Sequence, residues 1–267
     1  MVLRVGDGID AAAASDQATR NPVATVAYAA LLVKQGGEAG ECEDRAVWRY
    51  DAATSAFRAA IADGASASLM AGEWAELLAT EYCKANDNSD FDGATVFRLA
   101  DRWRQRVAAE PLPWYAQAKA ALGAFATLAG VTVHAGGRWD ALTAGDSCVF
   151  QVRDGALVAA HPIDRANDFG RVPILLGTAG VDPAGSLQGR AGSYEPGDHL
   201  YLMTDALAAW ALGEIEGGRD PWNWLAALET DVNPLPFARW IADRRGAGRL
   251  ENDDVCLLHL RLGGDPE

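Results

Sequence analysis

The stretch Ala59-Ala-Ile-Ala-Asp63-Gly64-Ala-Ser-Ala-Ser68 contains an apolar run that ends abruptly at an acidic residue followed by glycine. The run His199-Leu-Tyr-Leu-Met-Thr-Asp205 also ends in an acid, and the cluster Glu251-Asn-Asp253-Asp254 stands directly before the apolar run from Val255 to Leu262. If these runs are strands, three separate segments bring carboxylates to strand ends. Carboxylates collected in this way are the hard oxygen ligands that divalent cations prefer, and such sites often serve hydrolysis or phosphoryl transfer.

Composition limits the classes of partner. The chain has 267 residues, of which 49% are hydrophobic, so it can bury one sizeable core. A formal net charge of −14 repels nucleic acid and anionic membranes, and we expect neither as a partner. The apolar stretches are too short or too interrupted for a membrane span, and residues 1–8 lack the layout of a secretory signal. The scattered cysteines predict buried, reduced thiols in a cytoplasmic protein: Cys42, Cys83, Cys148 and Cys256.

The first half of the chain predicts strands followed by two helices. Residues 23–33 are apolar and fit a strand or a helix, whereas 46–50 and 55–62 fit two strands joined by a turn. Two helical faces follow at spacings of three and four, with Trp74, Leu77, Leu78 and Tyr82 on the first and Val96, Leu99, Trp103 and Val107 on the second. The polar segment 86–93 between them has acids or amides at alternate positions but lacks the terminal glutamate of a calcium loop, so we interpret it as a turn.

The second half predicts strands, helices and a last strand. Short strand-like runs occupy 139–143, 147–152, 156–160 and 199–203, and Asp154-Gly155 marks a hairpin. Helices are expected after Asp205 and over 222–228 and 237–244, before the strand 255–262. No linker or repeat divides the chain. The order predicts an α+β domain with antiparallel sheets and separate helices, comprising residues 23–262, with an arm or edge element at 1–22 and a tail at 263–267.

Each acidic residue also has a purely structural interpretation. Asp63-Gly64 and Asp146 fit turns, Asp205 fits a helix N-cap, and Asp253 with Asp254 could simply begin a strand. Turn residues need no partners elsewhere in the chain, however. Several acids at the ends of apolar runs therefore favour convergence on one site.

Five short motifs, in a consistent order, resemble the PP2C (PPM) family of metal-dependent serine/threonine protein phosphatases in a divergent bacterial form. The resemblance extends over about residues 33–262. The segments that carry it are Glu43-Asp44, Ala60-Ile-Ala-Asp63-Gly64-Ala-Ser66, Gly145-Asp146-Ser147 with the hairpin through Gly155, Pro196-Gly197-Asp198 through Thr204-Asp205, and Asn252-Asp253-Asp254-Val255. Each motif is weak alone, but their order and spacing together form a fairly specific signal.

The resemblance implies a four-layer αββα sandwich of two antiparallel sheets flanked by helix pairs, with two Mn²⁺ or Mg²⁺ ions at one end. It implies that a metal-bridged water hydrolyses phosphoserine or phosphothreonine in a protein substrate. By position, Asp63, Asp205 and Asp253 would be the catalytic metal ligands, together with the Gly64 carbonyl. Glu43 and Asp44 would act through metal-bound waters.

Departures from the family pattern leave an alternative open. The family usually has a phosphate-binding arginine shortly before its Glu-Asp motif; residues 35–41 contain none, and Lys34 and Arg45 are the nearest cations. Thr204-Asp205 is followed by Ala206 where the family has glycine, Ala121 falls near the place of an aspartate that supports a third metal, and Ala65 stands where many members have histidine. The alternative is a pseudophosphatase that acts as a regulatory binding module.

An unrelated metal-dependent hydrolase is disfavoured by the histidines of the chain. The sequence has only four of them, in or beside strand-like runs, and we interpret all as structural: His134, His161, His199 and His259. They form no convincing Ser/His/Asp or Cys/His set for nucleophilic catalysis.

Overall fold

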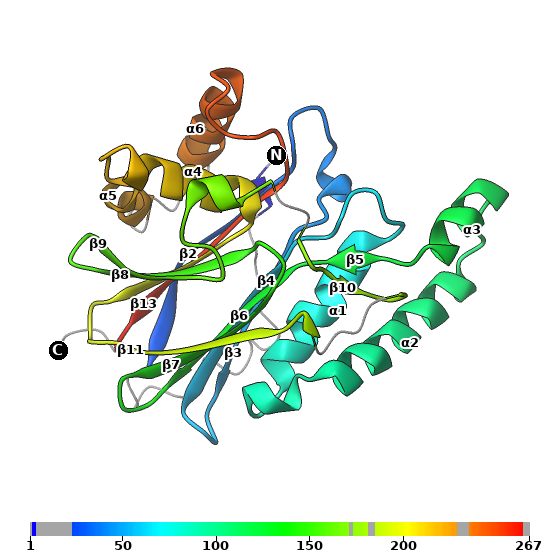
Figure 1. The fold of residues 1–267 in the computed structure, drawn as a ribbon, viewed down its shortest axis with the longest axis horizontal. Helices are drawn as coiled ribbons and strands as arrows, with labels where there is room; N and C mark the ends of the chain where they lie inside the picture. Colours follow the sequence, from blue (N-terminus) through cyan, green and yellow to red (C-terminus); the bar gives the residue numbers. More distant parts are fainter. Residues whose placement is uncertain (1, 4–22, 171–172, 181–184, 229–234, 264–267) are drawn as a thin grey trace.

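Two antiparallel β-sheets lie at the centre of the fold, and helices cover their outer faces (Figure 1). The structure is a computed structural model that describes residues 2–3, 23–170, 173–180, 185–228 and 235–263. Sheet 1 has the strand order β1 (Val2–Leu3), β2 (Ala24–Leu32), β13 (Val255–Leu262), β12 (His199–Met203), β8 (Cys148–Arg153) and β9 (Ala156–His161). Sheet 2 has the order β11 (Gln188–Ser193), β7 (Arg138–Ala144), β6 (Leu128–His134), β4 (Ala56–Ala62) and β3 (Arg45–Asp51).

The remaining elements are helices and one short strand pair. The helices are α1 (Ala71–Lys84), α2 (Gly93–Ala109), α3 (Trp114–Ala121), α4 (Asp205–Glu216), α5 (Pro221–Ala227) and α6 (Leu235–Gly246). The 3₁₀ turns are η2 (Ala39–Glu41), η3 (Asn88–Asp90) and η4 (Ala166–Asp168), and β5 (Phe125–Ala126) pairs with β10 (Leu176–Gly177).

Alternation along the strands creates four layers, because successive side chains of a strand point to opposite faces. In β4, Ala59 and Ile61 pack in the core between the sheets, whereas Ala60 and Ala62 pack against helix residues that include Trp74 and Leu78 of α1. In β12, Leu200 and Leu202 face the other sheet, and Tyr201 and Met203 pack with residues of α4, α5 and α6. The predicted αββα sandwich is therefore confirmed.

Most of the predicted elements form. The apolar faces proposed for the two early helices are buried in α1 and α2, and Asp92 caps α2 by accepting a hydrogen bond from the Thr95 N–H at 2.8 Å. The ambiguous run 23–33 is strand β2, which pairs with β13. Strands β6 and β11 and helix α3 were not predicted. Strand β6 is buried on both faces and so shows no polar alternation. Strand β11 is an exposed edge strand that contains two glycines, so it has no apolar alternation to read, and α3 is short and buries little of its surface.

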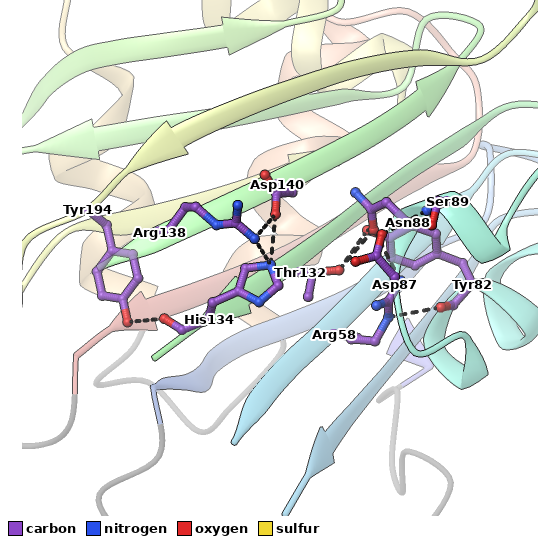
Figure 2. A network of polar contacts seen from close by, with 10 residues as sticks. All are labelled: Arg58, Tyr82, Asp87, Asn88, Ser89, Thr132, His134, Arg138, Asp140 and Tyr194. Atoms are coloured by element: carbon purple, nitrogen blue, oxygen red, sulfur yellow. Dashed lines mark hydrogen bonds and ion pairs between the residues drawn. The ribbon is translucent and has the colours of Figure 1, made fainter. Parts of the chain in front are cut away.

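The polar segment 86–93 is a turn, as predicted, and hydrogen bonds attach it to sheet 2. Figure 2 shows Asn88 among Arg58 of β4, Tyr82 of α1 and Thr132 of β6. The Asn88 Oδ1 atom accepts hydrogen bonds from the Arg58 guanidinium at 3.1 Å, the Tyr82 hydroxyl at 2.9 Å and the Thr132 hydroxyl at 3.1 Å. The acids of this turn serve its own backbone: the Asp90 carboxylate, for example, accepts from two preceding N–H groups.

The chain ends contribute little to what the structure describes. Val2–Leu3 pairs with Leu31 and Leu32 as an edge strand of sheet 1, but most of the predicted arm, residues 4–22, lies outside the described residues, as do residues 264–267 of the predicted tail. Within the described part of the chain, no helix combines the length and the apolarity needed to cross a bilayer.

Candidate metal centre

Acidic residues from distant parts of the sequence line one hollow of about 430 Å³. We call it the acidic hollow. Three of its acids, Asp63, Asp205 and Asp253, come from the segments that the sequence analysis singled out, and Asp146 and Glu251 join them. The end of β4, the end of β12 and the segment before β13 therefore meet here, as the repeated pattern of acids predicted.

Asp63 follows the last residue of β4, and its backbone is fixed by two hydrogen bonds to Thr127. Its N–H donates to the Thr127 hydroxyl at 3.0 Å, and its carbonyl accepts from the Thr127 N–H at 2.9 Å. The next residue must be glycine because a Cβ at Gly64 would lie 2.7 Å from the Ala71 carbonyl carbon, at the start of α1. The close approach of α1 thus explains why this strand ends in Asp-Gly.

Asp205 is the first residue of α4, and Thr204 rather than Asp205 occupies the N-cap position. The Thr204 hydroxyl does not cap the helix. It donates to Asp44 Oδ2 at 3.1 Å and accepts from the Cys256 N–H at 2.8 Å. Thr204 therefore links the Glu43-Asp44 loop to the start of α4 and to β13.

Asp253 and Asp254 have different surroundings. The buried Asp254 carboxylate accepts the Lys34 N–H at 2.8 Å and the Glu43 N–H at 2.7 Å. Asp253 lines the acidic hollow, and Arg245 holds its backbone carbonyl by a hydrogen bond. Only Asp253 of this pair is placed to contribute an oxygen to the hollow.

Neither Glu43 nor Asp44 lines the acidic hollow. Asp44 is fully buried, and its Oδ1 atom has no hydrogen-bond partner among the described residues. Glu43 lines a neighbouring hollow of about 450 Å³, and Ser66 lines both. The role of Glu43 and Asp44 through metal-bound waters stays a prediction.

Burial and mutual repulsion dominate the electrostatics of these acids. Burial raises the pKa of Asp205 to about 7, and the nearby Asp146 adds to the effect. Burial likewise raises the pKa of Asp63 well above its usual value, with Asp205 and Asp253 as further causes. The pKa of Asp44 is raised in the same way by burial and by Asp63. Clustered carboxylates of this kind are stabilised by a nearby cation.

The donor set fits a hard divalent cation that keeps part of its water shell. It offers carboxylate oxygens with the Gly64 carbonyl nearby, and the unpartnered Asp44 Oδ1 atom can accept from a water. As they stand, no three Asp, Glu, His or Cys side chains of the described residues are arranged to hold a metal ion by themselves. Direct ligands would therefore have to shift toward the ion or be supplemented by water, which Mg²⁺ in particular retains.

The two cations suggested for phosphate binding differ in how they are used. The Arg45 guanidinium donates to the carbonyls of Cys42 at 2.7 Å and Asp44 at 2.8 Å, and it packs against Gly72. Arg45 thus supports the Glu43-Asp44 loop. The Lys34 ammonium donates to the Ser66 hydroxyl at 2.9 Å, next to the acidic hollow. Lys34 is the better placed of the two to meet an anion there.

Asp146 is an additional acid of the hollow, which its sequence context predicted only as a turn residue. It lies in the bend between β7 and β8, where Gly145 has a φ of +83° and a Cβ would come within 2.7 Å of Thr127 Cγ2. The signal was present in Gly145-Asp146-Ser147, whose Ser147 hydroxyl lies 2.6 Å from that of Thr127, the residue that holds Asp63.

The predictions for histidine and cysteine agree with the structure. The four histidines lie in β6, β9, β12 and β13, and none lines the acidic hollow. The four cysteine thiols are free and buried, and burial raises the pKa of Cys42 and of Cys83 to about 12. Thiols with such pKa values are poor nucleophiles.

Comparison with known families identifies the chain. The sequence model of protein phosphatase 2C matches residues 37–245, which is more than half of the chain and contains most of the acids described above. The chain belongs to the protein phosphatase 2C family. No curated protein matched the sequence.

Solved structures with the same fold include several bacterial phosphatases. The serine/threonine phosphatase of S. agalactiae is 13% identical, with a TM-score of 0.57 over 90% of this chain and 100% of that chain. The Mycobacterium tuberculosis phosphatase PstP/Ppp is 17% identical, with a TM-score of 0.56 over 90% of this chain and 99% of that chain. A PstP catalytic domain determined with two manganese ions is 19% identical, with a TM-score of 0.53 over 88% of this chain and 97% of that chain. At these identities the likeness concerns the fold.

Proposed function

We propose that this member of the protein phosphatase 2C family hydrolyses phosphoserine and phosphothreonine in proteins with the aid of two Mn²⁺ or Mg²⁺ ions. The observation that carries the proposal is that Asp63, Asp205 and Asp253, from three distant segments, line one hollow. The family match supports the reaction class, and the two manganese ions of the PstP catalytic domain support the kind and number of ions. The four free thiols favour a reducing compartment such as the cytoplasm.

In this proposal each residue has a defined task. The ligands of the ions would be the carboxylates of Asp63, Asp205 and Asp253 and the carbonyl of Gly64. The waters bound to the ions would be oriented by Glu43 and Asp44. When bound, the two ions would supply an activated water for attack on phosphorus and neutralise charge on the phosphate. Thr204 fixes Asp44 through the 3.1 Å hydrogen bond to Oδ2. Lys34 meets the phosphate at the Ser66 side of the hollow.

A pseudophosphatase remains the second candidate because the phosphate would meet few cations. No arginine or lysine lines the acidic hollow in the described structure, and the Arg45 guanidinium is already used by two backbone carbonyls. A binding module of this fold would hold a phosphoprotein or another partner without turnover.

Hydrolysis of p-nitrophenyl phosphate and of phosphoserine peptides, each with Mn²⁺ and with a chelator, tests the proposal. We expect Mn²⁺-dependent turnover that falls at least about 100-fold in Asp63→Asn, which keeps the side-chain shape but removes the ligand charge. Asp154→Asn is the matched control, because Asp154 is exposed at the β8–β9 hairpin. It should retain the wild-type rate.

Two outcomes would contradict the proposal. One is turnover by Asp63→Asn close to that of wild type. The other is wild-type protein that shows no Mn²⁺-dependent turnover on either substrate while it binds a partner protein, which would favour the pseudophosphatase.

A further inference from the structure

A third hollow, larger than the two described above, lies beside α4. Its volume is about 900 Å³, within the range of small-molecule and peptide-sized sites. We call it the α4 groove. Its lining comes from one face of α4, from Arg219 shortly after that helix, and from the segment 248–251 that precedes β13.

The α4 groove adjoins the candidate metal centre. Ala209 and Glu251 line both the groove and the acidic hollow. A substrate whose phosphate entered the acidic hollow would therefore have its neighbouring residues beside α4.

The groove offers space and an apolar wall. Ala206, Ala209 and Gly213 lie at helical spacing on α4, and a Cβ built at Gly213 would meet only Ala166 Cβ at 3.9 Å. Trp210 also lines the groove and is 8% exposed. Small residues on this face of α4 leave room for the backbone of a peptide.

The charges of the groove are not equivalent. The Arg219 guanidinium is held by both carboxylate oxygens of Glu214, at 2.7 and 2.8 Å, so this pair is neutralised internally. Arg249 is exposed, and within the described structure its side chain has no ion pair or hydrogen bond. Glu251 stands at the junction with the acidic hollow. An acidic substrate residue would thus be repelled next to the phosphorylated residue and attracted further along the groove.

We propose that the α4 groove binds the peptide that flanks the phosphorylated residue, and that Arg249 selects substrates with an acidic residue at a distance from it. This inference rests on the proposed function in one respect only, namely that the phosphate enters the acidic hollow. It assigns the groove and Arg249 a role in choosing the substrate, separate from the chemical step.

Peptide binding tests the proposal without requiring turnover. The probes are three labelled peptides in which a non-hydrolysable phosphonate replaces phosphoserine. The first has glutamates before the phosphonate, the second has glutamates after it, and the third has glutamines at both places. Fluorescence anisotropy with Mn²⁺ should give wild type a preference of about fivefold for one of the two acidic peptides, the magnitude of an exposed charge pair. Arg249→Glu should abolish or reverse that preference.

Arg239→Glu is the matched control, because Arg239 is exposed on α6, lies outside the groove and undergoes the same charge change. It should retain the wild-type preference. Gly213→Leu provides a second variant that fills the groove, and it should weaken the binding of all three peptides. The proposal is wrong if wild type does not distinguish the peptides, or if Arg249→Glu and Gly213→Leu bind as wild type does.

Hydrolysis of p-nitrophenyl phosphate by wild type separates this inference from the proposed function, because that substrate has no flanking residues. Mn²⁺-dependent turnover without any peptide preference overturns the groove and leaves the phosphatase. A peptide preference that depends on Arg249, in a protein without turnover, supports the groove and overturns the phosphatase.

Discussion

The adjacent acids Asp253 and Asp254 serve different parts of the structure. The Asp254 carboxylate joins β2 and the Glu43-Asp44 loop to the start of β13 by accepting two backbone N–H groups, whereas Asp253 lines the acidic hollow. Asp254 is buried away from the hollow, and each of its carboxylate oxygens already accepts one backbone N–H, so it is less available to a metal ion than Asp253. The same reasoning divides the cations, because Arg45 is engaged by carbonyls and Lys34 reaches a single hydroxyl.

The different contacts of Lys34 and Arg45 predict that one substitution changes KM and the other changes stability. Lys34→Met should raise KM for a phosphopeptide by about tenfold, because a charge-assisted contact with the phosphate is lost, while thermal stability stays near that of wild type. Arg45→Met should lower the free energy of unfolding by about 1–3 kcal/mol, because two carbonyls lose their donor. Steady-state kinetics and urea unfolding of both variants check this.

Either prediction can be contradicted by these measurements. A rise in KM for Arg45→Met in a protein of wild-type stability would mean that Arg45 binds the phosphate. An unchanged KM for Lys34→Met would remove Lys34 from the proposed site.

At the scale of elements, Asp198 fastens the start of β12 to β8. The whole residue is only 1% exposed. Its carboxylate accepts two hydrogen bonds from the Arg153 guanidinium, through Nε and one terminal nitrogen, each at 2.8 Å. It also accepts from the Gln151 amide at 2.8 Å and from the Glu195 N–H at 3.1 Å. Burial alone would raise the pKa of Asp198, but these hydrogen bonds outweigh it and hold the pKa below its usual value.

We therefore expect Asp198→Asn to lower the free energy of unfolding at pH 7 by about 1–3 kcal/mol. The pKa is depressed in the folded state, so the stabilisation is fully present above the ordinary aspartate pKa of 3.8 and is lost as the pH falls through the folded-state pKa. The difference between wild type and Asp198→Asn should accordingly shrink below about pH 4.

Urea unfolding between pH 7 and the acid limit measures this difference. Asp243→Asn, an exposed position on α6, is the control and should match wild type throughout. A difference between wild type and Asp198→Asn that persisted unchanged into acid would show that the ionised carboxylate is not what holds β12 to β8.

Elements were predictable where burial imposes a period on the sequence. The spacing in α1 and α2 follows from one buried face, and the structure reproduces it. Strand β12 is buried on both faces, and its continuous apolar run predicted it. Strand β11 escaped because Gln188–Ser193 pairs along β7 at an exposed edge, and Gly192 leaves room for the Trp139 indole instead of contributing a side chain of its own. Backbone pairing of this kind leaves little trace in local sequence.

At the scale of the whole molecule, the two-sheet sandwich brings the site together. Strand β4 belongs to sheet 2 and β12 to sheet 1, and both end at the acidic hollow where β13 begins. The local pattern of acids at strand ends favoured convergence on one site, and the resemblance to a family added which of the acids would be ligands. Asp146 was missed because a turn residue between β7 and β8 looks the same whether or not its side chain faces other acids.

The α4 groove shows the limit of sequence patterns more clearly. Its walls come from α4 and from residues 248–251, which are far apart in the chain and carry no shared motif. A small residue such as Gly213 in a helix predicts close packing as readily as open space. The packing of α4 against its neighbours decides between them.

The central claim is that the acidic hollow holds divalent ions, and anomalous diffraction from crystals equilibrated with millimolar Mn²⁺ tests it most directly. We expect two manganese peaks in the hollow, ligated only by oxygen from Asp63, Gly64, Asp205, Asp253 and water, and we expect Asp63→Asn to lose them. An empty hollow at that Mn²⁺ concentration, or peaks confined to other surfaces of the molecule, would contradict it.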